Sequence, residues 1–191
     1  MIGYSNGQIQ MYNQNSLVNS FKAHSNWINR IKQSPFNTNT NYVATCSEDK
    51  TVKIWNVSSS LNWTRITTYS QHTSGVYALE WLDNDTLASG SSDRTIRLWS
   101  PTTGQTKRTI QTNQEVYSLK LLNTNIHLAA GLGNGDINIY NINDANLVSS
   151  LKGHSDWVYD LVQISNELLA SSSGDGTVRI WNLTTTRVNS F

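Results

Sequence analysis

The chain has 191 residues and a formal net charge of +1, from 14 Lys and Arg against 13 Asp and Glu. This length corresponds to about one domain, and the balanced charge gives no field that would attract nucleic acid or an anionic membrane. The longest uninterrupted apolar run, Val76 to Leu79, is too short for a membrane-spanning helix. We therefore expect neither nucleic acid nor a membrane among its partners.

Two further features bear on the location of the protein. The first residues, Met1 to Gly7, have neither the basic start nor the apolar stretch of a secretion signal. The single cysteine, Cys46, has no partner for an internal disulfide, which suits a reducing compartment. We expect an intracellular protein, cytoplasmic or nuclear.

From the N-terminus onward, the sequence repeats itself with a period of 41 to 44 residues. Each copy closes with a stretch in which apolar and polar residues alternate before an aromatic residue. These closing stretches are Gln8–Asn13, Thr51–Asn56, Thr95–Ser100, Asp136–Asn141 and Thr177–Asn182. Because side chains on a strand alternate between two faces, each stretch is predicted to be a half-buried β-strand.

A tight-turn sequence precedes every closing strand. The turns are Ser5-Asn6-Gly7, Glu48-Asp49-Lys50, Ser92-Asp93-Arg94, Gly133-Asn134-Gly135 and Gly174-Asp175-Gly176. Asn-Gly and Asp-Gly tolerate the positive φ angles of tight hairpins. Two apolar strands precede each of the last four turns, for instance 76–81 and 86–91, and a fourth strand follows the aromatic residue, at 62–69, 105–110, 146–151 and 185–191.

Four antiparallel strands per period predict an all-β fold built from β-propeller blades. We expect one domain over residues 1–191. It comprises a partial blade over 1–21 and four full blades over about 22–69, 70–110, 111–151 and 152–191.

Three of the copies share a further pattern of spaced residues. A His opens the copy, a Ser or Thr lies four residues before the Asp of the turn, and a Trp lies six residues after that Asp. The three sets are His24, Thr45, Asp49 and Trp55; His72, Ser89, Asp93 and Trp99; and His154, Ser171, Asp175 and Trp181. With Gly153-His154 and Trp181-Asn182, the pattern resembles the WD-repeat β-propeller family, and the resemblance covers the whole chain.

The resemblance implies a structural role for these three sets. In WD-repeat proteins the His, Asp, Ser or Thr, and Trp of one blade form a hydrogen-bonded chain that ties three strands together. A buried imidazole, carboxylate and indole N–H each need such a partner. The same residue types occur in acyl-transfer triads, but three copies of one active site are not expected in a small chain. We interpret the sets as structural and expect no catalytic residue.

The other two copies lack this pattern. The fourth copy has Asn113, Ala130, Asn134 and Tyr140 at the corresponding positions, and the truncated first copy has Ile2, Asn6 and Tyr12. Because these polar groups are missing, we expect the two corresponding blades to be the least stable local units of the fold.

The resemblance also implies a partner-binding surface. In the family, residues after the His and the residue before the turn Asp line the narrow rim of the ring, which commonly binds peptides and proteins. The corresponding candidates here are Trp27, Asn29, Glu48, Tyr77, Ser92, Glu115, Tyr117, Trp157 and Tyr159. Trp and Tyr are typical of interface hot spots. The alternative is that some of these rings pack between blades as part of the repeat architecture.

Rings of this family usually have seven blades, so we expect the ring to be incomplete. The chain is then a fragment of a longer ring; alternatively, it closes as an irregular five-bladed ring or assembles with another copy. Open blade edges favour self-association.

The function expected from these features is a non-catalytic scaffold that binds a protein or peptide on its aromatic rim. One alternative is a fragment of a larger WD-repeat regulatory or ubiquitin-ligase adaptor protein without an independent function. A propeller enzyme is a further alternative, which requires converging charged residues that the sequence does not gather. His24, His72, His127 and His154 are not clustered as metal ligands, and we expect no metal and no cofactor.

Overall fold

A computed structural model describes residues 1–36, 41–57, 62–184 and 188–190. Within these ranges the regular structure consists of β-strands alone. No helix among the described residues is long and apolar enough to cross a membrane. The expectation of an all-β fold is confirmed.

The strands form five antiparallel sheets, each built from strands consecutive in sequence. The first sheet has three strands: β1 (Ile2–Gly3), β2 (Gln8–Asn13) and β3 (Ser16–Lys22). Blade two consists of β4 (Ile28–Gln33), β5 (Tyr42–Ser47), β6 (Val52–Val57) and β7 (Trp63–Tyr69). Blade three consists of β8 (Val76–Asp83), β9 (Thr86–Ser91), β10 (Thr95–Trp99) and β11 (Thr106–Gln111).

The last two blades follow the same order. Blade four consists of β12 (Val116–Leu121), β13 (His127–Leu132), β14 (Ile137–Asn141) and β15 (Leu147–Leu151). Blade five consists of β16 (Val158–Gln163), β17 (Leu168–Ser173), β18 (Val178–Asn182) and β19 (Val188–Ser190). The outermost strand expected over 185–191 is described only at 188–190, because residues 185–187 and 191 lie outside the described residues.

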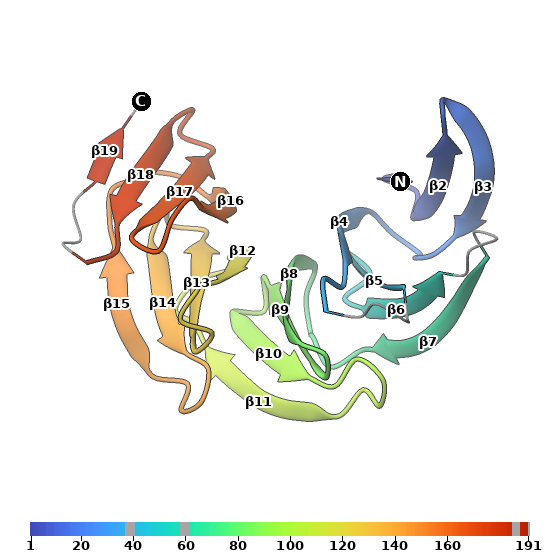
Figure 1. Ribbon diagram of the computed structural model, residues 1–191, viewed down its shortest axis with the longest axis horizontal. Coiled ribbons are helices and arrows are strands. Elements are labelled where there is room, and N and C mark those ends of the chain that lie inside the picture. Colours follow the sequence, from blue (N-terminus) through green and yellow to red (C-terminus); the bar gives the residue numbers. More distant parts are fainter. Residues whose placement is uncertain (37–40, 58–61, 185–187, 191) are drawn as a thin grey trace.

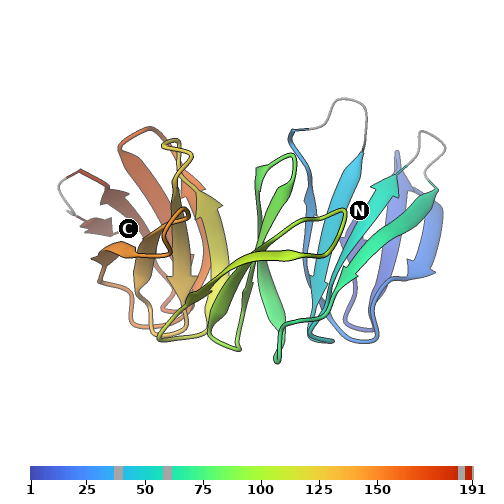
Figure 2. The same cartoon turned by 90° about the horizontal axis from the view of Figure 1, so that it is seen from below.

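The sheets stand side by side along an arc, with β4, β8, β12 and β16 on its inner side (Figure 1). Seen from the side, the strands run between two rims where the loops gather (Figure 2). The first sheet and blade five lie at opposite ends of the arc, and the ring is open between them (Figure 1). This confirms the prediction of an incomplete ring.

The predicted turns have the backbone conformation that tight hairpins require. The residue after the Asn or Asp has a positive φ in all five turns: 69° at Lys50, 64° at Arg94, and 80°, 88° and 80° at Gly7, Gly135 and Gly176. A β-carbon on Gly7 would lie 2.1 Å from the carbonyl oxygen of His24, and one on Gly135 would lie 2.3 Å from that of His154. These two glycines let the turn pack against the loop that opens the next blade.

The core lies between neighbouring sheets. The first apolar residue of each closing strand is fully buried in the first four sheets, at Ile9, Val52, Ile96 and Ile137. In blade five, at the open end of the arc, the corresponding Val178 is 49% exposed. Burial at this position therefore depends on the presence of a following blade.

Candidate functional site

A β-bulge in the innermost strand of each full blade positions the rim residues. The pairing register skips one residue between Ile28 and Arg30, between Val76 and Ala78, between Val116 and Ser118, and between Val158 and Asp160. The skipped residues are Asn29, Tyr77, Tyr117 and Tyr159, all of them predicted rim residues. A bulge bends the strand locally and reorients the side chain that it leaves unpaired.

Three tyrosines at these bulges and Trp157, directly before β16, come together across three blades. Tyr77 and Tyr117 have ring centroids 4.9 Å apart, and Trp157 stacks on Tyr117 at 5.0 Å with an angle of 5° between the rings. Tyr159 meets the edge of Trp157 at 6.2 Å. We call Tyr77, Tyr117, Trp157 and Tyr159 the aromatic strip. With Asn29 and Arg30 the strip lines a shallow cavity of about 200 Å³.

The aromatic strip remains open to solvent. Trp157 is 44% exposed and Tyr159 is 48% exposed, while Tyr77 and Tyr117 are half-buried. The four rings thus contact one another across blades, as packing between blades would require, and they still expose surface to solvent. Stacked aromatic rings of this kind offer a large, rigid contact area at a low cost in side-chain entropy.

Carboxylates lie beside the strip. Burial raises the pKa of Tyr77, and the neighbouring Glu48 carboxylate raises it further. Burial also raises the pKa of Tyr117, with Glu115 as the next contribution. Both hydroxyls consequently stay protonated as hydrogen-bond donors at neutral pH.

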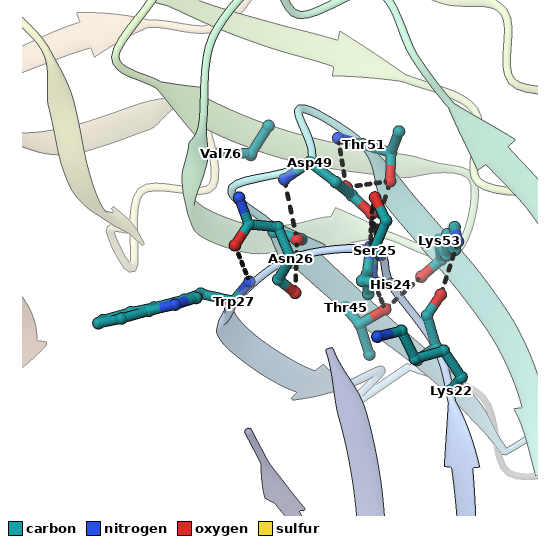
Figure 3. A network of polar contacts seen from close by, with 12 residues as sticks. Lys22, His24, Ser25, Asn26, Trp27, Thr45, Asp49, Thr51, Lys53 and Val76 are labelled. Carbon is teal, nitrogen blue, oxygen red and sulfur yellow. Dashed lines mark hydrogen bonds and ion pairs between the residues drawn. The ribbon is translucent and has the colours of Figure 1, made fainter. Parts of the chain in front are cut away.

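The other rim candidates are placed differently. Trp27 is 60% exposed and projects from its loop away from the blade (Figure 3), and it does not line the cavity beside the strip. The Asn29 amide donates to the Val76 carbonyl at 2.9 Å, linking blades two and three. Ser92 donates its hydroxyl to Ser74 at 2.8 Å, and Glu115 lies 3.8 Å from Arg94.

The three sets interpreted as structural form hydrogen-bonded networks inside their blades, and Figure 3 shows the network of blade two. In blade two, His24 bonds to Asp49 through Nδ1 at 2.9 Å and to Thr45 through Nε2 at 2.7 Å, and Trp55 donates its indole N–H to Thr45 at 2.9 Å. The same three contacts, at 2.7 to 3.1 Å, occur in blade three, among His72, Asp93, Ser89 and Trp99, and in blade five, among His154, Asp175, Ser171 and Trp181.

Each network contains residues that sequence reasoning missed. A threonine two residues after the Asp donates its hydroxyl to the Asp carboxylate at 2.6 to 2.7 Å, at Thr51, Thr95 and Thr177. The backbone N–H after the His also donates to that carboxylate, at Ser25, Thr73 and Ser155. The threonines could have been found from the sequence, because a Thr recurs two residues after each Asp. The backbone donors could not, because every residue type except proline has a backbone N–H.

The networks set the charge states in the blade interior. Burial lowers the pKa of His24 by more than the Asp49 carboxylate raises it, so the imidazole is held neutral. Burial acts to raise the pKa of Asp49, but hydrogen bonds from Thr51 and Ser25 outweigh it and lower the pKa to about 2. A neutral imidazole and an ionised carboxylate satisfy each other without a net buried cation.

Blade four replaces this network with a smaller one. The buried Tyr140 hydroxyl accepts a hydrogen bond from the Asn138 amide at 3.0 Å, while Ala130 offers no polar group. In the first sheet, Tyr12 is 43% exposed and donates to Gln10.

Two charged contacts across the arc were also missed. Glu80 in β8 is 3% exposed, lies between Lys32 of β4 and Lys120 of β12, and accepts the Leu121 N–H at 3.0 Å. The three side chains occupy equivalent repeat positions, so their alternating sign was a usable signal. Arg30 of blade two forms an ion pair with Asp160 of blade five at 3.2 Å, a pairing that the sequence does not indicate.

Among the described residues, no three His, Cys, Asp or Glu side chains are grouped as metal ligands.

Sheets arranged around a common centre, each with its innermost strand turned inward, define a β-propeller protein. The family model described as "WD domain, G-beta repeat" matches residues 15–56, 63–100 and 145–182. The chain therefore belongs to the WD-repeat family. The unmatched stretch from 101 to 144 contains most of blade four, where the polar network is replaced.

Two of the three relatives described below are named as subunits of protein complexes. The anaphase-promoting complex subunit cdc20 of Dictyostelium discoideum is 28% identical over 177 residues, covering 89% of this chain and 35% of the relative. Periodic tryptophan protein 2 of Arabidopsis thaliana is 31% identical, with coverages of 82% and 17%. The target of rapamycin complex subunit LST8 of Saccharomyces cerevisiae is 35% identical over 101 residues, 51% of this chain and 33% of the relative. The chain spans about a third or less of the length of these relatives.

A solved structure shows the same fold. The crystal structure of the computationally designed Ika8 protein superposes with a TM-score of 0.78 at 23% identity, covering 99% of this chain and 57% of that one.

Proposed function

We propose that the protein is a non-catalytic scaffold that binds a peptide or protein segment on the aromatic strip of its rim. The observation that supports this proposal is the run of Tyr77, Tyr117, Trp157 and Tyr159, which stack across three blades while two of them stay nearly half exposed. Exposed aromatic clusters with polar neighbours are the surfaces that typically carry binding energy between proteins.

The neighbouring residues give the site its polar contacts. Glu48 and Ser92 lie on hairpin turns, Glu115 directly precedes β12, and Asn29 lines the cavity beside the strip. We infer that these groups orient the bound segment while the rings contribute most of the contact area. Trp27, on the same rim but outside the strip, is proposed as a separate contact.

The names of the relatives agree with a role in assemblies. Subunits of the anaphase-promoting complex and of the target of rapamycin complex are among them. We infer protein partners, an intracellular location and no enzymatic activity. Because the chain spans only part of each relative, a second possibility is that its binding function belongs to a larger WD-repeat regulatory or adaptor protein.

An affinity capture experiment with mass spectrometry tests the proposal. The wild-type chain is compared with a Tyr117→Ala/Trp157→Ala variant, and Trp27→Ala is tested separately. The matched control is Leu147→Ala/Val148→Ala, which removes two side chains that are 54% and 53% exposed on the outermost strand β15. We expect specific proteins to be retained by wild type and control and lost from the strip variant.

The purified partner then allows a direct affinity measurement. Loss of the two stacked rings is expected to weaken binding by at least about tenfold, as for a typical hot-spot pair. Equal affinity of the strip variant and the wild type, with both proteins folded, would reject the strip as the binding site.

A further inference from the structure

The aromatic strip lies beside half-buried carboxylates. Glu48 stands on the turn between β5 and β6, and Glu115 directly precedes β12. We propose that the segment bound by the strip places a positively charged side chain, lysine or arginine, on the rings of Tyr77 and Tyr117, beside these two carboxylates. The inference rests on the function proposed above and adds the chemistry of the partner.

Glu48 belongs to blade two but lies against blade three. A β-carbon on Gly75 would overlap the Glu48 carboxylate and lie 3.4 Å from the Tyr77 hydroxyl oxygen. Glycine at this position therefore leaves the space that the carboxylate occupies beside the ring. Burial and then the Glu48 carboxylate raise the pKa of Tyr77, because a second negative charge would be unfavourable there.

Glu115 is placed in the same way beside the next ring. A β-carbon on Gly133 would lie 2.9 Å from a Glu115 carboxylate oxygen and 3.2 Å from the Tyr117 ring. Burial raises the pKa of Tyr117, and the charges of Glu115, Glu48 and Asp156 raise it further. Carboxylates from three successive positions along the rim thus act on one aromatic side chain.

The chain does not neutralise these carboxylates fully. Among the described residues, no Lys, Arg or His nitrogen lies within ion-pair distance of the Glu48 or Asp156 carboxylate. Glu115 has Arg94 at 3.8 Å, and that side chain is 60% exposed. Arg30, which lines the cavity of the strip, already forms an ion pair with blade five at 3.2 Å. Uncompensated negative charge therefore remains beside the rings.

A basic side chain matches both kinds of group at once. Cations are attracted to the faces of aromatic rings, and more strongly where the contact excludes water. Carboxylates add charge-assisted hydrogen bonds, and the apolar stem of Lys or Arg can cover ring surface while its charged end reaches them. An acidic segment would be repelled by the same carboxylates, so charge would also select the partner.

The groups that carry this inference lie inside the arc. Tyr77 and Tyr117 belong to blades three and four, each of which has a neighbouring blade on both sides (Figure 1). Their rings meet with centroids 4.9 Å apart. Their placement beside Glu48 and Glu115 is set by contacts between adjacent blades, and it does not depend on the two ends of the arc.

Defined peptides test the charge directly. The probe is a capped pentapeptide, Gly-Ala-Arg-Ala-Gly, and a second probe has lysine at the central position. The matched control has citrulline there, which keeps the shape of arginine without its charge. Binding is followed through the Trp157 indole and Tyr117 ring resonances. We expect saturable shifts at low millimolar concentration with both cationic peptides, and at least about tenfold weaker binding of the citrulline peptide.

Protein variants locate the contact. Glu48→Gln/Glu115→Gln keeps the size of both side chains and removes their charge, and it should weaken binding of the arginine peptide at least about tenfold. The matched control is Asp83→Asn/Glu167→Gln, which removes two exposed carboxylates at the opposite ends of β8 and β16. The control should bind as the wild type does, and thermal unfolding checks that each variant is folded.

Equal affinity for the arginine and citrulline peptides would refute the basic side chain, as would the lack of a saturable shift with either cationic peptide. A protein partner found by affinity capture separates this failure from that of the proposed function. If Tyr117→Ala/Trp157→Ala loses the partner but Glu48→Gln/Glu115→Gln binds it at full affinity, the strip stands and the cation is refuted. If both variants bind it at full affinity, the strip itself is refuted.

Discussion

At the level of single residues, stability depends on carboxylates that satisfy buried donors. Asp93 accepts hydrogen bonds from the His72 ring, the Thr73 and Thr95 backbone N–H groups and the Thr95 hydroxyl. Because His72 is only 4% exposed, its ring nitrogen cannot turn to water when the carboxylate is removed. The carboxylate therefore contributes chiefly by preventing an unsatisfied buried donor.

Asp93→Ala is expected to destabilise the fold by about 3 kcal/mol, because several hydrogen bonds to one charged group are lost. In a chain of this length that corresponds to a decrease in Tm of roughly 6–12 °C. Thermal unfolding followed by circular dichroism measures it. The matched control is Asn134→Ala, at the equivalent, exposed turn position of blade four. A Tm of Asp93→Ala equal to that of the control would contradict the structural role.

Stability is also expected to decrease on acidification. The folded-state pKa of His24 lies below its ordinary value of 6.5, so the unfolded chain takes up this proton first, and the contribution of His24 is lost as the pH falls below 6.5. Asp49, with a pKa lowered from 3.8 to about 2, contributes above pH 3.8 and loses that contribution as the pH falls toward 2.

Denaturant titrations at several pH values between 7.5 and 5 measure the first of these effects. His24→Gln should make the free energy of unfolding less dependent on pH in this interval. This change in slope is expected however much the substitution lowers the free energy of unfolding itself. His127→Gln, outside the polar networks, serves as control. An unchanged pH slope in His24→Gln would show that another group is responsible.

At the level of strands and blades, the same pattern of strands is stabilised to different degrees. Blades two, three and five have the complete network, and blade four relies on apolar packing around Leu128, Leu132 and Ile137, all fully buried. The first sheet has neither the network nor an innermost strand. Local stability should follow these differences.

Hydrogen exchange measures this order directly. Amides of the first sheet are expected to exchange fastest, and those of β13 and β14 faster than those of β9 and β10 in blade three. Blades three and four are the fair comparison, because both have a neighbour on each side (Figure 1). Equal protection in β9 and β13 would mean that the network adds nothing to local stability.

At the level of the whole molecule, the open arc leaves one sheet face without a neighbour. Ile164 and Val178 are 55% and 49% exposed in blade five, whereas their equivalents Leu122 and Ile137 in blade four are nearly or completely buried. An uncovered apolar face of this kind promotes association. Self-association is thus proposed as a property of the open form.

The prediction is that Ile164→Lys/Val178→Lys reduces concentration-dependent association without lowering Tm by more than about 2 °C, since surface changes usually have small effects on stability. Analytical ultracentrifugation over a range of protein concentrations measures the association. A variant that sediments as the wild type does at every concentration would exclude this face as the contact.

The sequence by itself determined the content of each blade. Strand alternation, the turn residues and the His, Ser or Thr, Asp and Trp spacing all act within one repeat, so they could be read from local periodicity. Thr45 and Trp55, for example, are ten residues apart on paired strands, and their contact follows from the hairpin that joins them.

Only the tertiary structure decided what happens between blades. Trp157 stacks on Tyr117, and Arg30 forms an ion pair with Asp160. Both contacts depend on bulges and on the angle between sheets, which no local sequence pattern encodes. Trp27 and Trp157 look equivalent in sequence, yet of the two only Trp157 has an aromatic partner among the described residues, because the sheet before Trp27 lacks an innermost strand. Whether a repeated residue is covered depends on its neighbouring blade, and that is a property of the assembled arc.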